Sequence, residues 1–110
     1  MVINLTELPL MNWSDAQILA AKELASDGMI REYELPTIKP EDRYTLVWTK
    51  AWETWDDIFN KFDNIDAVII QGEPAFVCNF VEACKSELPP VKCYSPCYDN
   101  NGNFVQFRRF

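Results

Sequence analysis

The sequence contains no histidine, and this absence alone removes several classes of chemistry. A Ser-His-Asp or Cys-His catalytic arrangement cannot be built within one chain, and imidazole cannot bind a metal. None of the four cysteines forms a C-x-x-C pair, and the interval from Cys78 to Cys84 is too long for a four-cysteine zinc site. The phosphate-binding patterns Gly-x-x-x-x-Gly-Lys and Gly-x-Gly-x-x-Gly are also absent. The sequence therefore predicts neither a metal centre nor a bound cofactor.

Long apolar runs and an excess of positive charge are missing as well. No apolar run reaches the length of a membrane-spanning helix and no signal peptide opens the chain, so we expect a cytoplasmic protein with reduced thiols and no membrane partner. The formal net charge of −7 argues against binding long nucleic acid, which requires a basic face. A small phosphate ligand stays possible, because backbone N–H groups and a few local cations are enough to hold one.

What remains is the composition of an ordinary globular domain. The chain has 110 residues, of which 48% are hydrophobic, and it carries seven Phe, four Tyr and four Trp. A chain of this length can bury a core without metal or disulfide staples. We therefore expect a single domain over residues 1–110.

Residues 66–74 form the segment around which the rest of the chain is organised. Four apolar residues, 67–70, run into Gln71 and Gly72, and Pro74 suits the first position of a following helix. A strand that is apolar on both faces is typical of a central parallel strand covered by helices on both sides. Gly72 permits a tight turn there, and that structural role alone would also explain the glycine.

The remaining elements follow from their spacing and their caps. We expect a strand over 2–5, a helix capped by Ser14 and ending at Gly28, and an edge strand over 29–35. A helix after Pro74 and strands over 91–95 and 103–108 complete the chain, with a turn over 99–102 between the last two.

The middle of the chain allows two interpretations. Apolar residues from Tyr44 to Phe62 recur at intervals of three and four, which indicates a helix over about five turns, with Pro40 placed at its beginning. Residues 44–49 are also rich in strand formers, so a strand is the alternative there. The aromatic stripe in this segment is more typical of core or of a dimer surface than of a ligand site; it consists of Trp48, Trp52 and Trp55.

The resulting order, β-α-β-α-β-α-β-β, predicts an α/β fold: a single Rossmann-like three-layer domain. Short right-handed crossovers favour a mainly parallel sheet of order 2-1-3-4-5 with an antiparallel strand at its C-terminal edge. In such sheets ligands bind beyond the carboxyl ends of the strands, where the strand order reverses. The loops that meet there are residues 4–11 and 71–73, with residues 95–98 beside them.

This edge could hold a phosphate-bearing ligand. The N–H groups of Gly72, Glu73 and Ala75 are expected to point out of a helix start, and the Gln71 amide can donate beside them. Thr6 and Ser95 add hydroxyl donors, which would complete an oxyanion cradle without a metal. If the Glu73 carboxylate faces inward it would repel phosphate, and its other role is to stabilise the helix N-terminus. Lys50, Arg108 and Arg109 are candidate cations for a polyanion, although such residues are more often solvated surface. Cys93 and Cys97 flank Ser95, but no base is available to activate a thiolate.

The combined pattern resembles the small CRISPR-associated proteins of the Csx type that act as ring nucleases. The resemblance covers most of the chain. Its most specific parts are the strand ending in Gln71-Gly72-Glu73 and the strand ending in Tyr94-Ser95. In this family an Asn in the first loop is often followed by His, whereas Asn4 is followed here by Leu5. The Tyr-Ser strand end is usually followed by Thr-Thr, whereas this chain has Pro96-Cys97.

The resemblance implies a homodimer that binds cyclic oligoadenylate across its two-fold axis and ends type III antiviral signalling by cleaving it. It implies a metal-independent mechanism in which a ribose 2′-hydroxyl attacks the neighbouring phosphate. On this basis the expected catalytic residues are Thr6, Gln71 and Ser95. The expected ligand contacts are Asn4, Leu5, Lys50, Gln71, Gly72, Glu73, Tyr94 and Ser95.

Two alternatives stay open at this stage. The missing histidine and the altered residues after Ser95 favour a module that binds the cyclic nucleotide without cleaving it. The acidic surface and the Trp-rich helix are also compatible with a protein-interaction domain, since a fold alone does not fix a function.

Overall fold

The computed structural model describes all of residues 1–110 and contains one five-stranded sheet of order β2-β1-β3-β4-β5. The strands are β1 (Val2–Leu5), β2 (Ile30–Glu32), β3 (Ala67–Ile70), β4 (Lys92–Tyr98) and β5 (Phe104–Arg109). All neighbouring pairs are parallel except β4 and β5, which are antiparallel. The predicted fold class, strand order and antiparallel edge strand are therefore confirmed.

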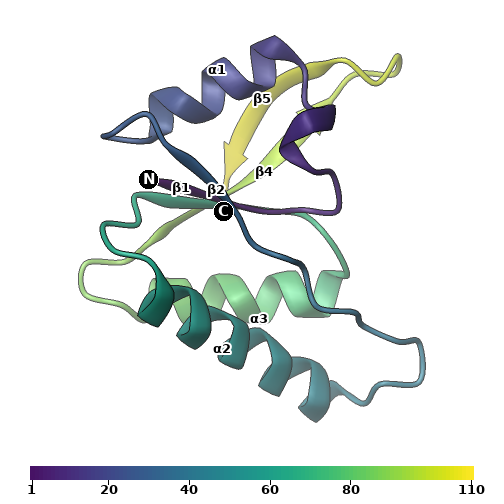
Figure 1. The fold of residues 1–110 in the computed structure, drawn as a ribbon. Helices are drawn as coiled ribbons and strands as arrows, with labels where there is room; N and C mark the ends of the chain where they lie inside the picture. The colour runs from purple at the N-terminus through teal and green to yellow at the C-terminus, as the bar shows by residue number, and fades with distance from the viewer.

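Helices cover both faces of this sheet, as Figure 1 shows. Helix α1 (Asp15–Leu24) lies on one face, preceded by the short 3-10 turn η1 (Leu10–Asn12), and helices α2 (Tyr44–Lys61) and α3 (Pro74–Lys85) lie on the other. The larger apolar cluster lies between the sheet and α2 and α3, and a smaller one lies beneath α1. No helix combines the length and the apolar character that crossing a membrane requires.

The two central strands explain why the sequence pattern was so clear. Every residue of β1 and β3 is buried. Ile3 and Val68 contribute to the cluster under α2 and α3, whereas Val2 and Ile69 contribute to the cluster under α1. Because β1 and β3 are parallel, both carboxyl ends reach the same edge of the sheet, where the predicted site residues begin.

Helix α1 begins as the sequence predicts but ends earlier. The Ser14 side chain accepts a hydrogen bond from the Gln17 N–H at 3.2 Å, which confirms the cap. The helix ends at Leu24, and Gly28 instead lies in the turn into β2, where its φ of +69° is a conformation that glycine adopts without strain.

Helix α2 confirms the helical interpretation of its segment, so the strand alternative for residues 44–49 is wrong. The predicted beginning at Pro40 is also wrong, because residues 40–42 form a turn and the helix begins after Arg43. In that turn the Asp42 N–H donates to the Lys39 carbonyl, and the Asp42 carboxylate accepts from the Lys39 N–H at 2.9 Å. The aromatic stripe divides: Trp55 is 1% exposed in the core, whereas Trp48 is 46% exposed.

Two strands differ in length from their prediction for reasons of pairing. β2 ends at Glu32 rather than at residue 35, because Asn4, its last partner, lies one residue from the end of β1. β4 continues to Tyr98 rather than ending at residue 95, because β5 returns beside it. Pro96 is tolerated in β4 since the pairing with β3 already ends at Tyr94.

Candidate functional site

Two hollows lie at the carboxyl edge of the sheet, on either side of the turn that joins β3 to α3. The turn passes close beneath Leu35: a Cβ atom at position 72 would lie 3.0 Å from the Leu35 Cδ2 atom. A side chain at position 72 would therefore crowd Leu35, whereas the backbone of the turn does not itself require glycine, since φ is positive only at Gly28 and Gly102 among the glycines. The larger hollow has a volume of about 600 Å³ and the smaller one of about 470 Å³.

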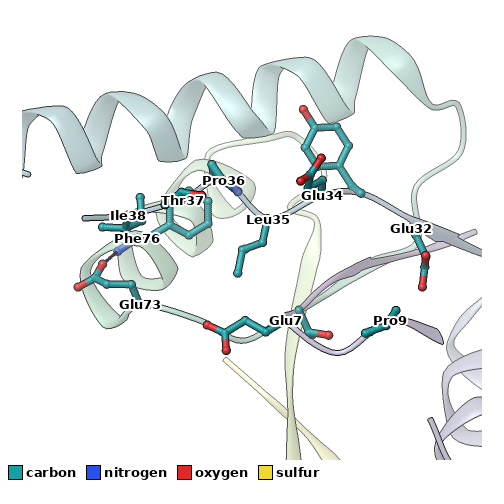
Figure 2. A pocket seen from close by; sticks show the side chains of 12 residues that line it. Glu7, Pro9, Glu32, Glu34, Leu35, Pro36, Thr37, Ile38, Glu73 and Phe76 are labelled. Atoms are coloured by element: carbon teal, nitrogen blue, oxygen red, sulfur yellow. Dashed lines mark hydrogen bonds between the residues drawn. The ribbon is translucent and has the colours of Figure 1, made fainter. Parts of the chain in front are cut away.

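The larger hollow is acidic. Four carboxylate side chains line it and no lysine or arginine does; they belong to Glu7, Glu32, Glu34 and Glu73. Figure 2 shows Leu35 projecting between the turn and the segment of Pro36, with Glu73 and Glu32 toward opposite ends. These four negatively charged carboxylates repel a phosphate, so this hollow is the less suitable place for an anionic ligand.

The start of α3 is closed by the chain itself. The Glu73 carboxylate accepts hydrogen bonds from the Ala75 N–H at 3.1 Å and from the Phe76 N–H at 2.8 Å; Figure 2 shows the bond to Phe76. Pro74 has no N–H, and the Val77 N–H donates to the Glu73 carbonyl. The Ala75 N–H, which the predicted cradle includes, is therefore already bonded within the chain, and the alternative role of Glu73, stabilising the helix N-terminus, is confirmed.

The first loop uses its polar side chains internally. The Asn4 side chain is 2% exposed; its amide donates to the Leu8 carbonyl at 3.1 Å and its oxygen accepts from the Thr6 hydroxyl at 2.7 Å. The Thr6 hydroxyl also accepts from the Leu8 N–H at 3.3 Å. Leu5 is fully buried in the core. Asn4, Leu5 and Thr6 therefore have structural roles, and Thr6 also lines the larger hollow; their expected ligand contacts stay predictions.

Two further expected contacts, Lys50 and Tyr94, line neither of these hollows. The Lys50 ammonium on α2 forms an ion pair with Asp42 at 3.0 Å and donates to the Thr37 carbonyl at 3.0 Å. The Lys39 N–H and then the Lys50 ammonium hold the pKa of Asp42 below its ordinary value. Tyr94 packs against the cluster beneath α1, on the opposite face of the sheet from Cys93. Neither residue therefore joins the predicted cradle.

The smaller hollow is where predicted site residues do come together. Gln71 and Gly72 from the β3–α3 turn and Ser95 from β4 line it. Gln71 is exposed and Ser95 is half-buried, so both side chains can be reached from solvent. The Gly72 N–H donates no hydrogen bond within the chain. An amide, a hydroxyl and an unused backbone donor thus converge on one hollow.

The charges around the smaller hollow also differ from those of its neighbour. Lys85 and Glu82 line it, and Arg108 lies directly opposite Ser95 in the β4–β5 ladder, so both side chains project from the same face of the sheet. Neither Lys85 nor Arg108 takes part in an ion pair, since the cations that do are Lys50 and the N-terminal ammonium. The lining of the smaller hollow therefore carries one carboxylate and one ammonium, and Arg108 is an uncommitted cation on the same face of the sheet as Ser95.

Sequence reasoning missed Lys85 and Phe110, and it named Arg108 without its place. Lys85 lies on the same helix face as Val81 and Cys78, a spacing of three and four that was available in the sequence. That this face borders a hollow depends on where the β4–β5 hairpin lies, which no local pattern reveals.

The buried thiols of the structure are unsuited to catalysis. A hydrogen bond with Cys93, followed by burial, raises the pKa of the Cys84 thiol well above its ordinary value. Cys93 is itself buried. Cys78 is exposed and lines the smaller hollow, but no histidine exists to activate it.

Comparison with known proteins adds no evidence about the function of this chain. No model of a known protein family, no curated protein and no solved structure matches this chain.

Proposed function

We propose that the protein is a ring nuclease that binds cyclic oligoadenylate and cleaves it without a metal at the smaller hollow. The observation that supports this proposal is that Gln71, Gly72 and Ser95 line one hollow, with Arg108 paired opposite Ser95 in the β4–β5 ladder. The resemblance to the Csx-type proteins suggests the ligand, and the acidic character of the larger hollow directs it to this side of the turn. The activity would end antiviral signalling that depends on such rings.

The cleavage reaction requires the protein mainly to position the reacting atoms of the ring and to stabilise charge. A ribose 2′-oxygen attacks the adjacent phosphorus, the bond from phosphorus to the 5′-oxygen breaks, and the 2′-hydroxyl proton is passed through solvent to that leaving oxygen. The product is a linear chain with a 2′,3′-cyclic phosphate and a 5′-hydroxyl. Gln71 and the Gly72 N–H would donate to the phosphate oxygens, and Ser95 would orient the leaving oxygen. Holding attacking and leaving atoms in line and stabilising charge are both recognised sources of rate.

The proposal includes a homodimer, in which a second copy of the chain also contacts the ring. The hollow opens at the surface, and a cyclic oligoadenylate carries equivalent phosphodiester groups on more than one side of the ring. A homodimer related by a two-fold axis would offer the ring two equivalent hollows, which would raise its apparent affinity without new contacts.

The test is a cleavage assay in a metal chelator with labelled cyclic tetra-adenylate and hexa-adenylate. We expect linear products ending in a cyclic phosphate, and we expect Gln71→Ala to lower the rate by about 10²-fold, as loss of one oxyanion donor does elsewhere. Gln106→Ala removes an exposed glutamine from β5 and serves as the matched control, with an unchanged rate. Full activity of Gln71→Ala would contradict the assignment of the site.

A second candidate function is binding of the ring without cleavage. The observation that favours it is the internal hydrogen bonding of Thr6 and Asn4, which removes a hydroxyl that the resemblance assigns to catalysis. Rings that bind tightly but are recovered intact after long incubation would select this candidate over the first.

A further inference from the structure

One face of α3 borders the smaller hollow along the whole length of the helix. The residues that line it recur at intervals of three and four; they are Pro74, Val77, Cys78, Val81, Glu82 and Lys85. Such spacing places them on one face, and eleven residue steps correspond to about 16 Å of helix. The hollow is therefore a groove between α3 and the β4–β5 side of the sheet, long enough for more than one phosphate group.

The groove changes character along its length. Its first end carries the donors Gln71, Gly72 and Ser95. Its apolar lining comes from Val77, which is partly buried, and from the aromatic side chain of Phe110, which is 45% exposed; Val81 beneath them is 6% exposed and belongs to the core. An apolar slot with an aromatic wall suits the flat face of a nucleobase, which stacks on aromatic rings.

The far end of the groove carries charge. Glu82 and Lys85 are both exposed there, and neither forms an ion pair. Glu82 lies eight residues beyond Pro74, which corresponds to about 12 Å along the helix. This separation is comparable with the length of an extended nucleotide from its phosphate to the exocyclic group of its base.

We propose that this groove reads the base: adenine lies on Val77 beside Phe110, and the Glu82 carboxylate accepts a hydrogen bond from its exocyclic amine. This inference rests on the proposed function, because it places a base of the ring whose phosphate lies at Gln71 and Gly72. A carboxylate only accepts hydrogen bonds, so it pairs with an amine and repels the oxo group that hypoxanthine carries at the same position. Glu82 is therefore a specificity-determining residue for adenine.

The test compares cyclic tetra-adenylate with cyclic tetra-inosinate, both with fluorine in place of the 2′-hydroxyls so that neither can be cleaved. By calorimetry the wild-type protein should bind the adenine ring at least about tenfold more tightly, the scale expected when a site built for a donor meets an acceptor. Glu82→Gln, whose amide both donates and accepts, should reduce this preference to about threefold or less. Glu23→Gln removes an exposed carboxylate from α1, across the sheet, and should leave the preference unchanged.

A second readout reports the place of binding. Cys78 is the exposed cysteine and lines the groove, so a bound ring should slow its labelling by a maleimide in the folded protein. Rings that bind with equal affinity, a preference unchanged by Glu82→Gln, or binding that leaves Cys78 labelling unaffected would each overturn this inference while the proposed function stands. Failure of both rings to bind would overturn the proposed function together with it.

Discussion

The phenol of Tyr33, at the rim of the larger hollow, donates a hydrogen bond to the Asp57 carboxylate on α2. Burial, and then the hydrogen bond and charge of Asp57, raise the pKa of Tyr33 from 10.0 to about 12. The folded protein thus holds this proton more tightly than the unfolded chain does. The contribution to stability is complete below pH 10 and is lost as the pH rises from about 10 to about 12.

The pKa of Tyr33 can be measured by comparing the wild type with a variant that lacks this phenol. The ultraviolet phenolate titration of the wild type minus that of Tyr33→Phe isolates Tyr33. We expect Asp57→Asn to lower the pKa of Tyr33 without restoring the ordinary value, because burial remains. Asp56→Asn, which removes an exposed carboxylate one residue away on α2, should leave the difference titration unchanged. An unchanged pKa in Asp57→Asn would contradict the role given to this hydrogen bond.

At the scale of the element, the stability of α3 depends on its first turn. Glu73 satisfies two N–H groups that no other group of the chain reaches. Glu73→Ala should therefore lower the free energy of unfolding by about 1 kcal/mol, measured by urea denaturation. Glu73→Asp retains a carboxylate that is favoured at helix N-caps and should recover most of the loss. Equal stability of the alanine variant and the wild type would show that the cap contributes nothing.

The elements could be predicted because their patterns are local, whereas most of the site could not. β3 is buried on both faces, so its apolar run was visible, and the interval of three and four residues identified α2. The role of Lys50 depends on the path of residues 37–42, and that of Asn4 depends on a loop that closes on Leu8. Placing Arg108 opposite Ser95 requires the register of a ladder that shifts between Cys97 and Tyr98. These contacts depend on tertiary structure, which the spacing of residues does not encode.

At the scale of the whole molecule, Asp66 joins three segments at the amino edge of the sheet. Its carboxylate accepts hydrogen bonds from the Met1 ammonium at 2.7 Å and from the Ser26 N–H at 2.9 Å. These contacts, the ammonium first, hold the pKa of Asp66 below its ordinary value of 3.8. A depressed pKa contributes stability above pH 3.8, and this contribution is lost as the pH falls from 3.8 through the lower folded value.

Because of this linkage, we expect Asp66→Asn to lower the free energy of unfolding by an amount that depends on pH. The variant should be less stable than the wild type by on the order of 1 kcal/mol at neutral pH, and the difference should narrow toward zero in acid. Denaturant unfolding at a series of pH values measures it. Asp63→Asn, an exposed carboxylate in the same connection, is the control and should show no such convergence. A cost of Asp66→Asn that stays constant down to acid pH would contradict the linkage.

The whole molecule places two hollows on either side of one turn, one lined by four carboxylates and the other by one carboxylate and one ammonium. The central claim is that the anion binds in the second, less acidic hollow. Amide NMR of the uniformly ¹⁵N-labelled protein, titrated with uncleavable cyclic tetra-adenylate, tests this most directly. The account predicts that the Gly72 N–H, the Gln71 side-chain amide and the Ser95 N–H shift, while Glu7 and Glu34 in the larger hollow do not. Shifts confined to Glu7, Glu34 and their neighbours, or no shifts at saturating ring, would contradict it.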